Sequence, residues 1–138
     1  MDKALNYLAL ARKGGRAELG EEPVGAVART GKAYAILVAS DAGDHTWRRA
    51  KAFAAGTDQQ AVKLPYTKDE MGFAIGRQAL AIAAITDAPL ALALVQSLPE
   101  PERYKEVIAA LTEKAAKLKK RQQEAKAHQK NVRTGKKK

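Results

Sequence analysis

The segment from residue 31 to residue 41, GKAYAILVASD, constrains the fold more than any other part of the chain. Residues 33–39 form an almost unbroken apolar run, and turn-forming residues stand on both sides of it. A short apolar run of this kind is typical of a strand that is covered on both faces. A second run, LAIAAI at residues 80–85, ends in the same way in Thr86-Asp87. Two buried strands with such flanks predict a layered α/β domain.

Helical patterns separate these runs. Apolar residues recur at helical spacing in five segments, which begin near residues 2, 21, 44, 67 and 87. Two shorter strands are predicted at residues 16–19 and 60–64. Thr67 and Glu70 match a capping box, in which each side chain accepts a hydrogen bond from the other residue's free backbone N–H. The order α-β-α-β-α-β-α-β-α predicts a three-layer α/β/α sandwich with a four-stranded mixed sheet.

The segment Pro99-Glu100-Pro101 marks a predicted boundary between a domain at residues 1–98 and a C-terminal part at residues 99–138. This second part begins with an amphipathic helix, whose apolar stripe either packs back on the domain or binds a protein partner. The stripe begins with Tyr104, Val107, Ile108 and Leu111. After Leu118 the stripe ends, and a basic arm follows that is either a solvated helix or disordered.

The positive charge of the chain is unevenly distributed. The whole sequence has a net charge of +10, and residues 112–138 hold eleven Lys or Arg against two Glu. Residues 1–111 hold fourteen Lys or Arg against thirteen Asp or Glu, so they are nearly neutral. A one-sided basic segment is typical of a protein that binds nucleic acid, although a solubilising tail has the same composition.

Several other classes of protein are disfavoured by the composition. The chain has no cysteine, which excludes disulfides and cysteine-ligated metals, and neither His45 nor His128 has a metal-ligand spacing. We find no catalytic motif, and we therefore expect a protein that is not an enzyme and has no cofactor and no metal. No apolar run approaches the roughly 20 residues of a membrane span, and the first residues lack a signal-peptide pattern. We expect a cytoplasmic protein without a membrane partner.

Three separate segments carry a resemblance to a known family. GEEPVGAVARTGKAYAILVASDAG, VKLPYTKDEMGFAIG and LAIAAITD together resemble the L-seven-Ae / L-thirty-e superfamily of ribosomal proteins, whose members bind kink-turn RNA. The chain looks most like the small bacterial YlxQ-type branch. The resemblance covers roughly residues 5–98 and leaves out the basic arm. It implies an α/β/α sandwich and a structured-RNA-binding protein that is ribosome-associated or ribosomal-protein-like.

The family's recognition helix begins with the pattern Gly-x-Asn-Glu-x-x-Lys, and its N-terminus enters an RNA groove. In this sequence Gly20 matches the glycine, whereas Glu22, Pro23 and Ala26 replace the Asn, Glu and Lys. The resemblance implies RNA contacts from Gly20, Glu21 and Glu22, on a recognition helix that has diverged. A helix N-terminus offers free N–H groups to phosphate, and short side chains in its first turn reach base edges.

The resemblance implies further contacts outside this helix. Lys32 stands at a basic position that family members keep after the recognition helix, and Arg29 lies beside it in the sequence. A family loop before the last strand covers an extruded nucleotide, and Arg77 and Gln78 occupy that place here. We also expect phosphate contacts from the basic residues after the first helix, which are Arg12, Lys13 and Arg16.

Two other functions fit the same sequence. The chain is alternatively a protein-interaction module that kept the fold but lost RNA reading, or an accessory domain of an enzyme that acts on RNA. In the first case its partner would bind the stripe on the C-terminal helix. A fold alone does not choose among these functions, because one fold carries many.

Overall fold

The computed structural model describes residues 2–133, and the side chains of residues 2–127. Its centre is a four-stranded sheet in the order β1-β4-β2-β3. Strand β2 (Ala35–Val38) pairs in parallel with β3 (Gln60–Lys63) and antiparallel with β4 (Ile82–Ile85). The other edge of β4 pairs antiparallel with β1 (Ala17–Leu19). The predicted four-stranded mixed sheet is therefore confirmed.

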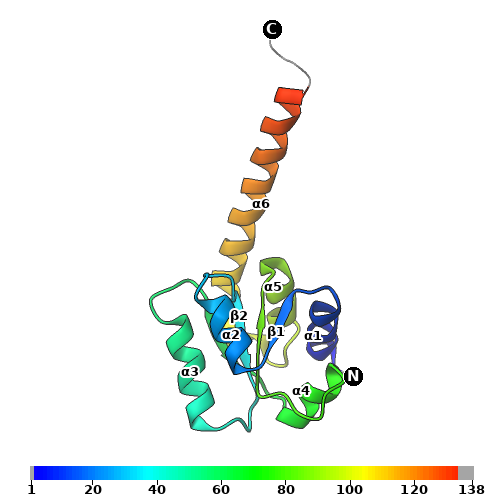
Figure 1. Cartoon of the computed structure of the whole chain (residues 1–138), viewed down its shortest axis with the longest axis vertical. Coiled ribbons are helices and arrows are strands. Elements are labelled where there is room, and N and C mark those ends of the chain that lie inside the picture. The colour runs from blue at the N-terminus through cyan, green and yellow to red at the C-terminus, as the bar shows by residue number, and fades with distance from the viewer. Residues whose placement is uncertain (1, 134–138) are drawn as a thin grey trace.

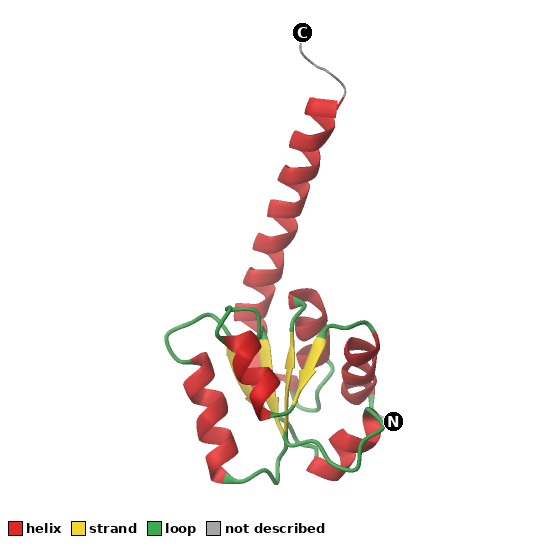
Figure 2. Ribbon diagram, viewed as in Figure 1, coloured by secondary structure: helices red, strands yellow, loops and turns green. Residues whose placement is uncertain are grey.

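Helices cover both faces of this sheet (Figures 1 and 2). Helices α2 (Glu21–Ala28) and α3 (Asp44–Ala54) lie on one face, with their own hydrophobic cluster. The other face is covered by α1 (Lys3–Lys13), α5 (Ala88–Gln96) and the first turns of α6 (Lys105–Arg133). Helix α4 (Lys68–Ala74) contributes to the same cluster, and a 3₁₀ helix (Pro101–Tyr104) leads into α6. This arrangement is the predicted three-layer sandwich.

The apolar run around β2 has a direct explanation in this layering. Successive side chains of a strand point to opposite faces of its sheet. Ile36 and Val38 accordingly pack in the α2–α3 cluster, whereas Ala35 and Leu37 pack in the cluster beneath α1, α4 and α5. All four side chains are fully buried. A strand between two helix layers needs apolar residues at every position, and this need removes the alternation seen in half-exposed strands.

Two helix starts follow from local sequence. The hydroxyl of Thr67 accepts a hydrogen bond from the Glu70 N–H at 3.1 Å, and the Glu70 carboxylate accepts one from the Thr67 N–H at 2.8 Å. The predicted capping box is therefore present at the start of α4. At α5, the carboxylate of Asp87 accepts a hydrogen bond from the Leu90 N–H at 2.9 Å. These bonds satisfy backbone donors that the first turn of a helix leaves free.

The stripe of α6 packs back on the domain. Leu111 is 1% exposed and belongs to the core cluster that contains Leu94 of α5. Tyr104, Val107 and Ile108 are partly buried and pack against the same cluster. The sequence left open whether this stripe packs on its own domain or binds a protein partner. In the structure it packs on its own domain. Leu111, one of the four residues of the alternative partner surface, is therefore covered by the chain itself, whereas the other three stay partly exposed.

Beyond Leu118 the same helix leaves the domain and projects from it as a single rod (Figure 1). Residues 119–127 are exposed, so the first part of the basic arm is a solvated helix. Residues 134–138 of the arm lie outside the described part. The division of the chain near residue 98 stays a prediction. Within residues 2–133, no helix combines the length and the apolar character that crossing a membrane requires.

Candidate nucleic-acid interface

Strand β4 separates two ends of the molecule. At its start, the Gly20 N–H donates to the Ile82 carbonyl at 3.0 Å. Just past its end, the Thr86 N–H donates to the Arg16 carbonyl at 2.9 Å. Helix α6 projects from the second of these ends, where Tyr34, Thr86 and α6 line one groove. We call this the α6 end, and the end that carries Gly20 the opposite end.

Five of the predicted RNA-binding residues are cations at the α6 end. Arg12 and Lys13 form the last turn of α1, and Arg16 follows just before β1. Arg29 is the C-cap of α2, and Lys32 lies between that helix and β2. All five are exposed. Because α1 and α2 both end at this end of the sheet, their basic C-terminal residues share one side of the molecule.

A buried glutamine fixes the backbone that carries Arg29 and Lys32. The side chain of Gln59 accepts a hydrogen bond from the Ala33 N–H at 2.8 Å and donates one to the Ala28 carbonyl at 3.2 Å. Gln59 is only 3% exposed, so water does not compete for these bonds. The chain on both sides of residues 29–32 is therefore held by one side chain, and the two cations project from a fixed turn.

Two carboxylates at the α6 end lie in ion pairs. Asp87 forms an ion pair with Arg16 at 3.7 Å, and Asp58 accepts a hydrogen bond from Lys114 of α6 at 2.8 Å. The hydrogen bond from Lys114 lowers the pKa of Asp58, although partial burial opposes this shift. The Lys114 pair also ties α6 to the segment before β3. Exposed residues of α6 add further positive charge nearby, and they are Lys117, Lys119, Lys120 and Arg121.

The other five predicted residues lie at the opposite end. Gly20 is the N-cap of α2 with a positive φ of 97°, and Glu21 and Glu22 begin that helix. Arg77 and Gln78 lie exposed in the turn between α4 and β4. The Arg77 N–H donates to the Gly72 carbonyl at 2.8 Å, so this turn folds back on α4.

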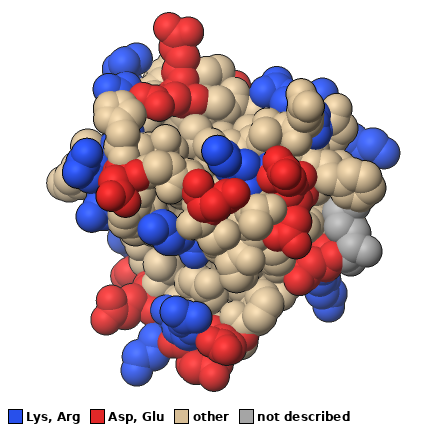
Figure 3. All heavy atoms as spheres, turned by 90° about the horizontal axis from the view of Figure 1, so that it is seen from below, with Lys and Arg blue, Asp and Glu red and all other residues tan. Residues whose placement is uncertain are grey.

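The opposite end does not concentrate one sign of charge. Seen from that side, Lys and Arg alternate with Asp and Glu over the surface (Figure 3). The carboxylate of Glu21 forms an ion pair with the Nε of Arg49 on α3 at 2.9 Å. With Glu22 exposed beside it, the start of α2 presents two carboxylates where the helix dipole alone would attract phosphate.

The structure thus divides the predicted site into two groups and does not bring them together. The four residues of β4 span roughly 13 Å, and the two groups lie at its two ends. Sequence reasoning also did not show that the cations of α6 lie at the same end of the molecule as Arg29 and Lys32. A signal existed in the apolar stripe, because a helix that packs over residues 105–118 is roughly 20 Å long and must pass the end of such short strands.

Comparisons with known proteins find similar structures but no similar sequences. No protein-family model matches the chain, and no curated protein matches it. The structure is similar to that of a protein of unknown function from Bacillus halodurans, with a TM-score of 0.62 and 20% identity over 81% of this chain and 99% of that one. It is also similar to the Giardia lamblia 15.5kD RNA binding protein, with a TM-score of 0.54 and 16% identity. This match covers 83% of this chain and 85% of that one. Likeness at these identities shows the fold.

Proposed function

We propose that the protein binds structured RNA and that the α6 end makes most of the phosphate contacts. The observation that carries the proposal is the gathering of cations at that end, on α1, the turn after α2, and α6. A one-sided cationic surface attracts a polyanion and neutralises its phosphates. The opposite end mixes both signs of charge, which makes it the weaker surface for a phosphate backbone.

The fold adds independent support. The Giardia lamblia 15.5kD protein, which has a similar structure, is an RNA-binding protein. The family resemblance of the three sequence segments points to the same ligand, and to a ribosome-associated role. In this proposal the cations position the RNA, because phosphate contacts carry no sequence information by themselves.

Paired charge variants test which end binds. Arg29→Gln with Lys32→Gln removes two charges from the α6 end, and Lys68→Gln with Arg77→Gln removes two from the opposite end. We expect the first pair to weaken binding to a structured RNA and to reduce the slope of log affinity against log salt by roughly 1.4–1.8. The second pair should change both quantities little. The measurement is a series of binding titrations at several salt concentrations.

The reverse pattern, with the larger loss in the Lys68 and Arg77 variant, would move the interface to the opposite end. Equal and negligible losses in both variants would contradict RNA binding through either group. Because each variant removes the same number of charges, a general effect of net charge is controlled.

Kink-turn recognition is the finer form of the proposal, and it would use the start of α2 at the opposite end in addition to the phosphate contacts at the α6 end. The exposed Ala26 supplies no cation, and Pro23 supplies no acceptor for a base edge. Glu22→Asn with Ala26→Lys restores part of the family pattern. Each good base contact contributes about 1–3 kcal/mol, so this variant should bind a kink-turn RNA at least about tenfold more tightly, with no such gain for a straight duplex. Tight, selective kink-turn binding by the native protein would show that other residues read the motif.

The other two functions receive less support. An interaction module that uses the α6 stripe would have to displace α5, because Leu111 is buried against the core. For an accessory domain of an RNA-acting enzyme, the RNA contacts proposed above would be the same. We assign the protein a binding role without a reaction of its own. That assignment and the cytoplasmic compartment stay predictions.

A further inference from the structure

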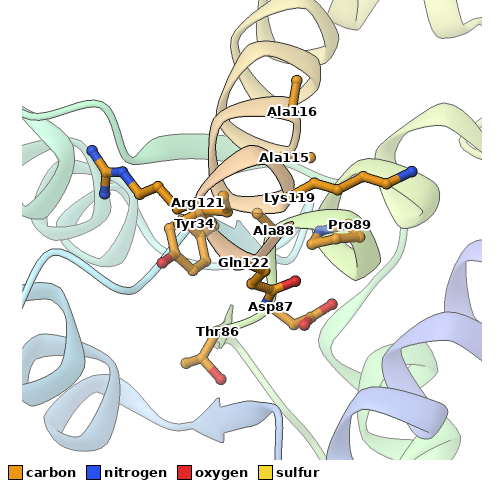
Figure 4. Close-up of a pocket in the computed structure, with 11 residues that line it drawn as sticks. Tyr34, Thr86, Asp87, Ala88, Pro89, Ala115, Ala116, Lys119, Arg121 and Gln122 are labelled. Carbon is orange, nitrogen blue, oxygen red and sulfur yellow. The ribbon is translucent and has the colours of Figure 1, made fainter. Parts of the chain in front are cut away.

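We infer that a groove between α6 and the start of α5 holds one unpaired nucleotide of the bound RNA. This inference rests on the proposed function. The groove has a volume of about 700 Å³. It is formed by segments far apart in the sequence: the residue before β2, the junction of β4 with α5, and the middle of α6 (Figure 4). Its lining includes Tyr34, Thr86, Ala88, Pro89, Ala115 and Leu118.

The inner surface of the groove suits a flat, apolar ring. Small side chains on α5 and α6, Ala88 and Ala115, keep the space open. Tyr34 supplies an aromatic ring at one side, and the Nζ of Lys114 lies 5.9 Å from the centre of that ring. The same ammonium group is paired with Asp58 at 2.8 Å, so the ring packs against a group that is itself held in place. Aromatic rings of this kind stack with nucleobases.

The rim of the groove suits phosphate. Lys119 and Arg121 extend from α6 in opposite directions (Figure 4), so cations flank the opening on two sides. The acidic residue in the lining, Asp87, already accepts a hydrogen bond from the Leu90 N–H and forms an ion pair with Arg16. A nucleotide combines the two chemistries, since its base is flat and apolar on its faces and its phosphates are anionic.

The position of the groove selects RNA over a free small molecule. It lies at the α6 end, and its lining joins Tyr34, two residues after the exposed Lys32 in the chain, to small residues and cations of α6 between positions 115 and 122. A backbone bound along those cations passes over the groove. A base within a duplex is stacked and paired, and therefore cannot enter, whereas a bulged or looped base can be turned out of the stack.

A pair of RNA hairpins tests the inference. One hairpin carries a single-nucleotide bulge, and the other is identical without it. We expect the native protein to prefer the bulged hairpin by about tenfold or more, because stacking of one base on an aromatic ring contributes about that much. Tyr34→Leu, which removes the ring, and Ala115→Leu, which fills the groove, should abolish this preference. Both should keep the affinity for the plain hairpin and its salt dependence.

Two control variants make the result specific. Tyr34→Phe keeps the ring and should keep the preference. Ala109→Leu adds the same isopropyl group as Ala115→Leu, but at an exposed position of α6 outside the groove. This variant should also keep the preference for the bulged hairpin. Thermal unfolding of each variant, followed by circular dichroism, verifies that the fold is intact. Since Ala115→Leu removes no core group, it reports on the groove even if Tyr34→Leu unfolds.

The outcomes separate the inference from the proposed function. Equal affinity of the native protein for both hairpins would overturn the inference and leave RNA binding in place. Retained preference in Ala115→Leu would place the extra nucleotide elsewhere and also overturn it. Binding of neither hairpin would contradict the proposed function, and the inference with it. A photoreactive 4-thiouridine at the bulge should crosslink to Tyr34 or to residues 115–122, and a crosslink confined to residues 20–22 or 77–78 would overturn the inference.

Discussion

At Gly72, helix α4 passes so close to the chain after it that no side chain fits. A Cβ atom there would lie 2.6 Å from the Cα of Ala79, 2.7 Å from its nitrogen and 2.9 Å from the Arg77 carbonyl oxygen. These obstacles are backbone atoms, which cannot rotate away. We expect Gly72→Ala to lower the free energy of unfolding by about 2 kcal/mol or more, as measured by chemical denaturation.

Gly14→Ala is the matched control for this substitution. Its Cβ would lie 3.5 Å from the nearest atom, which is an ordinary contact, and its φ of −85° suits any residue. The expected change is within about 0.5 kcal/mol. Equal stability of the two variants would show that the turn with Arg77 and Gln78 is not held against α4 as described.

Single residues also show where sequence reasoning stops. The Thr67–Glu70 capping box and the Asp87 cap were predictable, because their partners lie three residues away. The role of Gln59 was not, since its side chain binds backbone atoms 26 and 31 residues distant. Nothing in the local pattern distinguishes such a glutamine from an exposed one. The residue that fixes Arg29 and Lys32 thus becomes visible only when the layers are assembled.

Among the elements, α6 has two halves with different environments. Its first turns bury Leu111 and partly bury Val107 and Ile108, and Tyr104 of the preceding 3₁₀ helix is partly buried with them. We expect a chain that ends at Leu98 to lose about 3 kcal/mol or more of unfolding free energy, because each fully buried apolar side chain contributes about 1.5–3 kcal/mol. A chain that ends at Leu118 should retain its stability. Denaturant titrations of both chains make the comparison.

Equal stability of these two chains would support the division of the molecule near residue 98 and would make α6 an appendage. The periodicity of α6 was readable from its sequence, as were the five earlier helices and both buried strands. The partner of its stripe was not readable, because an apolar stripe has the same spacing whether it faces its own domain or another protein. The structure decides between these two alternatives, because it places α5 and β3 against α6.

For the whole molecule, the distribution of charge between its two ends matters more than the net charge of +10. Nine of the twenty residues from 119 to 138 are Lys or Arg. We expect removal of these residues to weaken RNA binding and to flatten its salt dependence, since fewer phosphates are neutralised. The remaining domain should stay folded and bind weakly through Arg29 and Lys32. Unchanged affinity and slope would show that the arm is a passive tail.

The arrangement of the whole molecule explains why the candidate site was only partly predictable. Composition and the family resemblance indicated which residues could contact RNA. They did not indicate which of these residues lie at the same end of the molecule, because that depends on the direction of each strand. Gly20 and Arg16 are four residues apart, yet β1 carries them to opposite ends of the sheet. A short strand that crosses the molecule separates neighbours in sequence and joins distant ones.

The continuity of α6 has a consequence for the energetics of its projecting half. An isolated basic peptide must nucleate a helix, a step with an equilibrium constant on the order of 10⁻³. Here the core has already formed the first turns around Leu111, and each later residue only extends an existing helix. The cations of the rod are therefore presented to a ligand with little further loss of chain entropy. Substitution of Leu111, a residue 1% exposed, would change RNA affinity by acting on helix nucleation at a distance.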